Sequence, residues 1–546
     1  MCAVSRIRRS GLAVILAVCF VRPVIAADEV IQAETYHVGV AAIDITPERP
    51  IRLNGFGFRR EEATEVRQRI WAKALVIGTD EQRPAVLVTV DVLGIPDKLV
   101  GELAERLAEQ TSIERERLAV TATHTHSGPM LQGENETLFG TPIPEEHLEH
   151  IAEYTRVFKL KLEQVVLDAL ADRKPAKLTW GIGTVRFAKN RRSADGPVDH
   201  DLPVLAVHSL SGELRAVYTS YACHCVTLSD NLISGDWAGY AQAAIERDYP
   251  DAIALCSVGC GADLNPNSGV TGDRADIALA QGEELATEVR RLLGGFMAPV
   301  RGELTTEFTR VVLPLAPLPT RAEWERRAAA ENAVGHYARV QLARLDRGEA
   351  LIEEIHAPIQ TWRFGDSLAV VLLPGETVVD YSLRLKRELD ASRLWINGYS
   401  NAAPGYIPSE RVLAEGGYEG GSAMTYYDIP GPYAPGLEQK IIDAVRAQAG
   451  EEFVATVDIS RTNNVPPLSP QQAAARIQTR PELRAQLVLA EPLVIDPVAI
   501  DFAPDGSLWV AEMHDYPEGQ GGDYQPGGQV RLVRDTDGDG RYDTAT

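Results

Sequence analysis

The segment Arg117-Leu118-Ala119-Val120-Thr121-Ala122-Thr123-His124-Thr125-His126-Ser127-Gly128-Pro129 joins a short apolar strand to two closely spaced histidines. Residues two apart in an extended backbone point to the same side, so His124 and His126 are predicted to face one small volume. The Ser-Gly-Pro that follows turns the chain away and leaves both imidazoles at a strand end. Open α/β sheets place ligands at that position. A bare His-x-His pattern favours a pair of surface histidines on a loop equally well.

The residues before this strand complete a strand–helix–strand unit. Val86 to Val90 is predicted to be a buried strand ending at Asp91, and residues 98–109 form an amphipathic helix with leucines at helical spacing. The crossover of such a unit is right-handed and its two strands are parallel. Asp91 and His124 are therefore expected at the same edge of one sheet.

Predicted strands and helices continue to alternate through the rest of the first 450 residues. Strands are predicted at residues 38–45, 178–180, 206–208, 216–222, 253–257 and 368–373, and helices at 146–171, 238–247 and 321–345. With 546 residues, of which 45% are hydrophobic, the chain can bury sizeable cores. The predicted fold class is α/β, with a mixed or parallel sheet and helices on both faces.

Four regions are expected along the chain. Residues 1–26 are typical of an export signal, with arginines before a short apolar run and small residues at the end. Residues 27–450 form the α/β domain, residues 451–485 a linker, and residues 486–546 a partial β-propeller-like segment. The signal predicts a protein that is secreted, periplasmic or held at the cell surface.

The C-terminal region has a different character. Residues 498–512 are typical of a hairpin turning at Asp505-Gly506, in the rhythm of one β-propeller blade. The region resembles the start of a bacterial β-propeller dehydrogenase-like domain. Its acidic loop spaces oxygen donors as a calcium loop does, which makes Ca²⁺ a candidate ligand, although a solvated acidic turn is equally favoured. The donors are Asp535, Asp537, Asp539 and Asp543.

Charge and cysteine content narrow the class of protein. A net charge of −23 argues against nucleic acid as a partner. Four cysteines remain after removal of the signal, and in an exported protein an even number suggests disulfides, here of unassigned pairing. Metal ligation by cysteine beside His224 is a lesser alternative. The cysteines are Cys223, Cys225, Cys256 and Cys260.

Metal-competent residues end buried strands or occupy glycine turns at four places, namely His124, His224, Glu376 and Tyr406. Nitrogen and oxygen donors of this kind suit zinc, with one position left for water. The alternatives are a satisfied core histidine at His224, a helix cap at Glu376 and an ordinary packed tyrosine at Tyr406. Their wide separation in sequence gives no local signature that decides between these interpretations.

Six short motifs in order resemble the neutral/alkaline non-lysosomal ceramidases over roughly residues 36–445. They are Thr123 to Pro129, Asn190-Arg191, Ala222-Cys223-His224, Ser234-Gly235-Asp236-Trp237-Ala238-Gly239-Tyr240, Pro374-Gly375-Glu376 and Tyr418-Glu419-Gly420-Gly421-Ser422. That family hydrolyses the amide bond of ceramide to a fatty acid and a sphingoid base. The resemblance implies an exported zinc-dependent hydrolase that cleaves N-acylsphingosine or a related N-acyl substrate by metal-activated water.

Carried over by position, the resemblance implies one Zn²⁺ per chain, held by the four metal-competent residues. It implies that His126 and Arg191 contact the substrate or the developing oxyanion, and that Tyr406 assists as ligand or proton donor. One departure stands out: Asn265 occupies the place of the family's catalytic serine, and an amide cannot serve as a hydroxyl nucleophile. It can orient substrate or donate to an oxyanion.

Two other functions remain open. The first is a non-catalytic binding module that has lost the serine. The second is a recognition unit fused to a propeller-type oxidoreductase. Asp236 and Asp263 are interpreted either as orienters of the histidines or as plain loop acids. A lipid-like substrate would bring transient contact with a membrane, while the oligomeric state is not indicated by the sequence.

Overall fold

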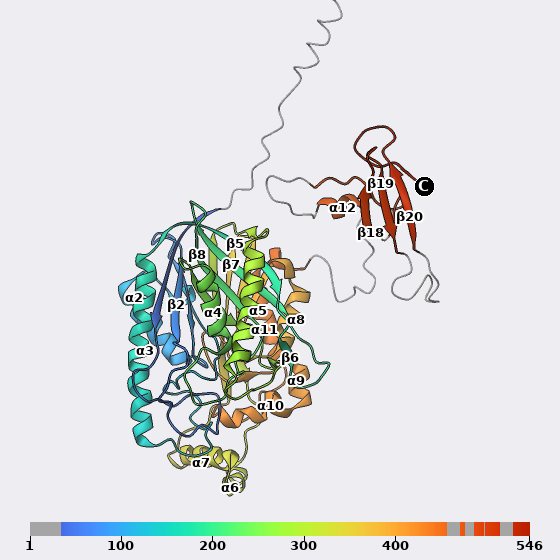
Figure 1. Ribbon diagram of the computed structural model, residues 1–546. Coiled ribbons are helices and arrows are strands. Elements are labelled where there is room, and N and C mark those ends of the chain that lie inside the picture. Colours follow the sequence, from blue (N-terminus) through green and yellow to red (C-terminus); the bar gives the residue numbers. More distant parts are fainter. Residues whose placement is uncertain (1–33, 456–469, 476–484, 496, 514–527) are drawn as a thin grey trace, which may run out of the picture. The chain divides into compact units, whose positions relative to one another are not determined.

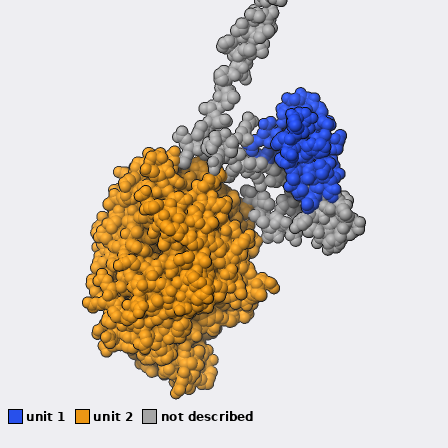
Figure 2. Space-filling view, viewed as in Figure 1, with its two compact units in different colours: residues 1–32, 461–546 blue, residues 33–460 orange. Residues whose placement is uncertain are grey.

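The computed structural model describes residues 34–455, 470–475, 485–495, 497–513 and 528–546. Residues 33–460 form one compact unit, and residues 461–546 belong to a second (Figure 2). The predicted signal peptide lies outside the described residues, as does most of the predicted linker. The predicted boundaries of the four regions therefore stay predictions.

A mixed nine-stranded sheet dominates the larger unit (Figure 1). In spatial order its strands are β4 (Leu118–Ala122), β3 (Ala85–Val90), β2 (Trp71–Ile77), β1 (Thr35–Asp44), β5 (Lys174–Thr184), β7 (Asp201–Ser209), β8 (Leu214–Tyr221) and β9 (Ile253–Val258), with β11 (Ala298–Pro299) beside β5. The pairs β3/β4 and β8/β9 are parallel and the others antiparallel. The strands β4 and β9 form the two edges of this sheet. Because β9 nevertheless packs against β4, the sheet is curled and its two edges lie close together.

A second sheet packs on the first. It contains β12 (Leu304–Pro314), β13 (Glu354–Phe364), β14 (Leu368–Leu372) and β16 (Leu394–Asn397), with β14 and β16 parallel. Alternate residues of each strand face the space between the sheets, where the rings of Tyr218 and Trp395 stack at 4.5 Å. This apolar layer joins the two sheets into one core, because burial of such area is the main stabilising term in folding.

Helices cover the outer faces of this pair of sheets. On the large sheet lie α2 (Asp97–Gln110), α3 (Glu145–Ala171), α4 (Asp236–Asp248) and α5 (Ala275–Leu293); on the small sheet lie α8 (Val379–Glu388) and α11 (Leu437–Ala449). The predicted α/β class with a mixed sheet is confirmed. The β3–α2–β4 unit places Asp91 and His124 at one sheet edge, as predicted.

Shorter elements connect these layers. They are β6 (Ala188–Asn190), β10 (Leu264–Pro266), β15 (Glu376–Thr377), β17 (Tyr406–Ile407), α9 (Glu410–Glu415), α10 (Gly417–Gly420), and 3-10 turns at Arg115–Arg117, Ala391–Arg393, Ser422–Tyr426 and Glu451–Phe453. Two two-stranded ladders, β6 with β10 and β15 with β17, lie in the loops after the main strands. These ladders bring together side chains that are far apart in sequence.

The prediction of one helix over residues 321–345 is wrong. The segment forms α6 (Arg321–Ala328) and α7 (Ala333–Asp346). Asn332 accepts a hydrogen bond from the backbone N–H of Gly335 and so begins a new helix. A capping asparagine competes with helix continuation, which explains the break.

The smaller unit contains a four-stranded antiparallel sheet of β18 (Pro497–Phe502), β19 (Leu508–Glu512), β20 (Gln529–Arg534) and β21 (Thr544–Ala545), besides α12 (Pro470–Ala475). The predicted hairpin is confirmed, with Gly506 at φ +83° in its turn. Its assignment to a propeller stays a prediction. No helix in the described part of the chain combines the length and the apolar run needed to cross a bilayer.

The expectation of disulfides among the four cysteines is wrong, because all four are buried free thiols. Cys223, Cys225 and Cys256 pack into the core beneath α4, whereas Cys260 packs into the core of the small sheet. Burial raises the pKa of each thiol, so the reactive thiolate is disfavoured. The cysteines act here as small core residues.

Alkylation of the protein purified without reductant tests this assignment. We expect the four thiols to resist iodoacetamide in the folded protein and to react fully after unfolding in denaturant. Peptide mass mapping measures both states. A disulfide-linked pair of peptides in the non-reduced digest would contradict the prediction.

Candidate metal centre

Two histidines are fixed by matching backbone contacts. His124 follows β4, and its Nδ1 lies 2.7 Å from the carbonyl oxygen of Leu93, in the loop after β3. His224 follows β8, and its Nδ1 lies 2.9 Å from the carbonyl oxygen of Gly261, in the loop after β9. A carbonyl only accepts, so each Nδ1 carries a ring proton, and in the neutral ring Nε2 keeps its lone pair.

The carboxylate of Glu376 completes this cluster. Its Oε2 lies 3.3 Å from Nε2 of His124 and 3.0 Å from Nε2 of His224. Because neither Nε2 carries a proton, Oε2 is a buried oxygen without a hydrogen-bond donor. Three lone-pair donors facing one another out of water need a cation between them, and two imidazoles with a carboxylate fit Zn²⁺.

Protonation in the protein without metal agrees with this arrangement. Burial and the charge of Arg191 lower the pKa of His224 to about 4, so the ring is neutral at pH 7. Neutral imidazoles and an ionised carboxylate are the forms that bind metal.

The fourth predicted donor, Tyr406, lies at the same point, and so does His126, which was predicted to contact the substrate. The ladder of β15 with β17 pairs Glu376 directly with Tyr406, and Tyr406 Oη lies 3.3 Å from Nε2 of His224. His126 Nε2 lies 3.3 Å from Nε2 of His124, and ligand nitrogens of His124, His126 and His224 all lie within 4.8 Å of one another. The structure thus brings the four predicted ligands together and adds His126 as a fifth donor within reach.

Arg191 is held beside this cluster by three side chains. Its Nε donates to Glu419 at 2.7 Å, its Nη2 to Tyr406 Oη at 2.9 Å, and its Nη1 to Asn265 Oδ1 at 3.3 Å. The pairing of β6 with β10 sets Asn265 beside Lys189, two residues from Arg191. Burial alone lowers the pKa of Arg191, but Tyr406 and Glu419 raise it, so the guanidinium stays charged.

Aromatic rings flank the donors. Phe56 lies 5.0 Å from the ring of His126 and 5.1 Å from Phe58, whose side chain is 67% exposed. On the other side Tyr418 lies 5.2 Å from Tyr406 and is 41% exposed. Exposed aromatic rings on both sides provide an apolar surface next to a polar centre, which suits a ligand with one apolar part.

The two loop acids do not touch the histidine rings. Asp263 accepts hydrogen bonds from Asn190 Nδ2 and from the backbone N–H of Val379, and thereby fixes the loop that carries Arg191. Asp236 accepts from the backbone N–H groups of Leu228 and Trp237. Both acids therefore order backbone segments around the site.

The sequence did not indicate a role for three polar residues near the centre, of which Glu419 and Glu134 are buried and Tyr427 is partly buried. Glu419 pairs with both Arg191 and Arg192, Tyr427 donates to Glu376 Oε1, and Glu134 lies beside the same carboxylate. Glu419 stands inside one of the quoted motifs, which was a usable signal. Tyr427 and Glu134 lie in segments without periodicity or motif, so only the folded chain reveals them.

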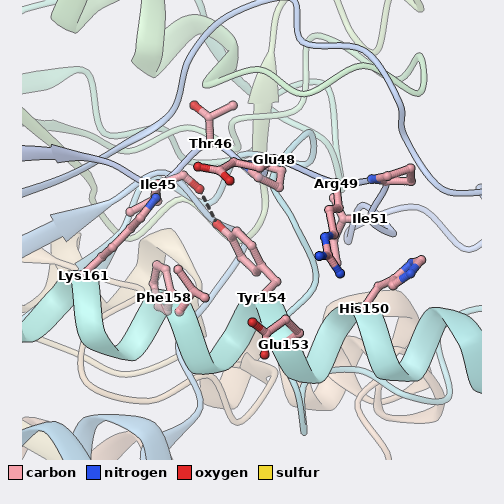
Figure 3. A pocket seen from close by; sticks show the side chains of 13 residues that line it. Ile45, Thr46, Glu48, Arg49, Ile51, His150, Glu153, Tyr154, Phe158 and Lys161 are labelled. Atoms are coloured by element: carbon pink, nitrogen blue, oxygen red, sulfur yellow. Dashed lines mark hydrogen bonds between the residues drawn. The ribbon is translucent and has the colours of Figure 1, made fainter.

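A separate cavity of about 230 Å³ lies between the loop after β1 and the helix α3 (Figure 3). Tyr154 donates there to the carbonyl oxygen of Ile45, and Lys161, Arg49 and Phe158 line it. None of the donors of the metal centre lines this cavity. The candidate metal centre at the strand ends and this cavity are therefore two separate sites.

Comparisons with known proteins agree with the motifs. Residues 36–257 match the family model of neutral/alkaline non-lysosomal ceramidase, N-terminal, and residues 469–546 match a domain of unknown function (DUF7133). The neutral ceramidase of Pseudomonas aeruginosa is 23% identical over 480 residues, which cover 71% of this chain and 69% of that protein. The neutral ceramidase of Mycobacterium tuberculosis is 26% identical over 486 residues, covering 71% and 74%.

A solved structure has the same fold. The crystal structure of neutral ceramidase from Pseudomonas aeruginosa aligns with a TM-score of 0.61 at 18% identity, covering 94% of this chain and 92% of that one. The resemblance to the neutral/alkaline ceramidases predicted from the motifs is confirmed.

Replacement of one donor tests the metal centre. We expect the purified protein to carry about one zinc ion per chain and His124→Ala to carry almost none, because a ligand nitrogen is lost. The control is His208→Ala on β7, which pairs with Leu214 at the far end of β8 from His224. Elemental analysis after dialysis measures both, and equal zinc in the two variants would contradict the assignment.

Gly55 tests how closely His126 is packed. Gly55 has φ +90°, and a Cβ there would lie 2.5 Å from Nδ1 of His126. We expect Gly55→Ala to lower the free energy of unfolding by more than about 1 kcal/mol. Gly101→Ala on α2, where a Cβ meets nothing within 4 Å, should instead raise it by roughly 0.5–1 kcal/mol. Chemical denaturation measures both; a harmless Gly55→Ala would show that the loop is not closely packed on His126.

Proposed function

We propose that residues 33–460 form a zinc-dependent amidohydrolase that cleaves N-acylsphingosine or a related N-acyl lipid. The observation that carries the proposal is the pair of unprotonated Nε2 atoms facing the unpartnered Oε2 of Glu376. The ceramidase family match supports the choice of an amide, and the exposed aromatic rings support an apolar substrate. Export through the predicted signal peptide is part of the same proposal.

Bound zinc would be held by His124, His224, Glu376 and Tyr406, and would polarise a carbonyl and lower the pKa of a bound water. Arg191 keeps its charge and is immobilised by Glu419, so it is a preorganised donor toward the oxyanion of a tetrahedral intermediate. Tyr406 Oη accepts from Arg191, which steadies the phenolic oxygen at the centre.

His126 suits a neutral role next to the reacting carbonyl. Burial lowers its pKa well below the usual range, so the imidazole is uncharged at pH 7. Its backbone carbonyl accepts a hydrogen bond from Arg59, and its ring lies against Phe56. A neutral imidazole in this position can take a proton from water and return it to the leaving nitrogen.

Asn265 is the residue that separates this proposal from serine chemistry. Its Oδ1 accepts from Arg191, so its amide N–H₂ is the group left to donate. Attack by water needs no hydroxyl at this position, whereas attack by a serine would. The absence of that hydroxyl is also what favours the alternative, a binding module that holds the lipid without cleaving it.

Turnover of a fluorogenic N-acylsphingosine separates these alternatives. We expect the wild-type protein to hydrolyse it, and Arg191→Lys to lower kcat/KM by about 100-fold, because one ammonium cannot replace the paired guanidinium contacts. Arg310→Lys, which changes an arginine paired with Asp97 at the start of α2, is the matched control. Turnover that appears only in Asn265→Ser would refute the water mechanism, and tight binding without turnover would favour the binding module.

Calcium in the C-terminal loop is a second, separate proposal. Carboxylate oxygens of Asp535, Asp537 and Asp539 lie within 4.8 Å of one another. Asp543 accepts hydrogen bonds from Thr536 and lies outside that group. The proposal therefore rests on three of the four acids, and calorimetric titration with Ca²⁺ tests it.

A further inference from the structure

The two oxygens of the Glu376 carboxylate have different surroundings. Oε2 faces the Nε2 atoms of His124 and His224, while Oε1 accepts a hydrogen bond from the hydroxyl of Tyr427. We infer that Tyr427 is a positioning residue, which holds Glu376 so that a single oxygen is presented to the metal. The inference rests on the proposed metal centre but not on the identity of the substrate.

Two glycines allow this close approach. Gly405 has φ +88°, and a Cβ there would lie 2.9 Å from Cγ of Tyr427. Gly375 has φ +58°, and a Cβ there would lie 2.5 Å from the carbonyl oxygen of Gly405. The turn before Glu376 and the turn before Tyr406 are thus packed directly on each other and on the ring of Tyr427. The same ring lies 5.8 Å from that of Tyr406, so one tyrosine contacts the segments that carry two proposed ligands.

A small cavity lies on the Tyr427 side of the centre. Its volume is about 10 Å³, and Glu134, Tyr427, Glu376 and His124 are among the residues that line it. Space of this size holds about one water molecule. Oε2 of Glu134 is buried without a hydrogen-bond partner, so a water there would link Glu134 with the polar groups across the cavity.

The hydrogen bond from Tyr427 to Oε1 affects how many positions on a metal the Glu376 carboxylate can occupy. A free carboxylate can bind a metal through one oxygen or two, and the second oxygen would take a position that substrate needs. The hydrogen bond from Tyr427 to Oε1 favours binding through Oε2 alone. Loss of the hydroxyl should therefore weaken metal binding and change the coordination, while the apolar packing of the ring is kept.

The test compares Tyr427→Phe with Tyr426→Phe in the full chain. Tyr426 is the matched control, because its ring lies against Tyr418 instead. Zinc affinity is measured by competition with a chromophoric chelator, and Co²⁺ bound in place of zinc reports coordination through its visible absorption. We expect Tyr427→Phe to bind zinc 10- to 100-fold more weakly and to change the Co²⁺ spectrum, with Tyr426→Phe close to wild type.

Thermal unfolding of the metal-free proteins separates positioning from a general structural defect. Equal melting temperatures of wild type and Tyr427→Phe, together with weaker zinc binding, support the inference. Wild-type zinc affinity and an unchanged Co²⁺ spectrum in Tyr427→Phe would overturn it. Failure of the wild type to cleave any amide would refute the proposed substrate alone. Failure of the wild type to bind metal would refute both the proposed function and the role of Tyr427.

Discussion

The structure around the site depends on two hydrogen bonds from histidine Nδ1–H groups to backbone carbonyls. Each histidine follows one strand of a parallel pair and donates to the loop after the other strand of that pair: His124 to Leu93 across β3 and β4, and His224 to Gly261 across β8 and β9. These bonds select the tautomer and aim both Nε2 atoms inward. A tautomer fixed by the second ring nitrogen is the usual way in which proteins prepare histidine for a metal.

The third parallel pair supplies the oxygen donors. Glu376 lies just after β14 and Tyr406 follows β16, and the short ladder of β15 with β17 then pairs the two residues. The three parallel pairs of the two large sheets thus end at one point, and the short ladder of β15 with β17, also parallel, lies beyond the third. The edges of the large sheet meet there because the loop after β16 connects them: Gly398 donates to Val258 at the end of β9, and Tyr399 accepts from Ala122 at the end of β4. Carboxyl ends of parallel strands are where α/β folds place their chemistry.

Sequence could predict the local part of this arrangement. Strand and helix periodicity predicted the β3–α2–β4 unit and the shared edge of Asp91 and His124, because both depend on neighbours in sequence. The closure of the sheet depends on hydrogen bonds between residues more than a hundred positions apart, such as Asn401 with Val120, which leave no periodic trace. The cysteine prediction relied on compartment and number, whereas packing placed the thiols in two separate cores. Glu134 and Tyr427 are polar residues whose importance comes only from what burial brings beside them.

The exchange of a serine for Asn265, which the resemblance to the ceramidases implies, would change less of the site than the residue types suggest. The serine hydroxyl would have been one group among several, and the remaining groups are fixed independently of it. Arg191 is held by Glu419 and Tyr406 as well as by Asn265, and Glu419 is itself paired with Arg192. The histidine tautomers depend on backbone carbonyls that no side-chain substitution removes. A site whose charges are oriented by this many separate contacts keeps its electrostatic preorganisation when one polar side chain is exchanged for another, and preorganised charge is the largest contribution that such sites make to catalysis.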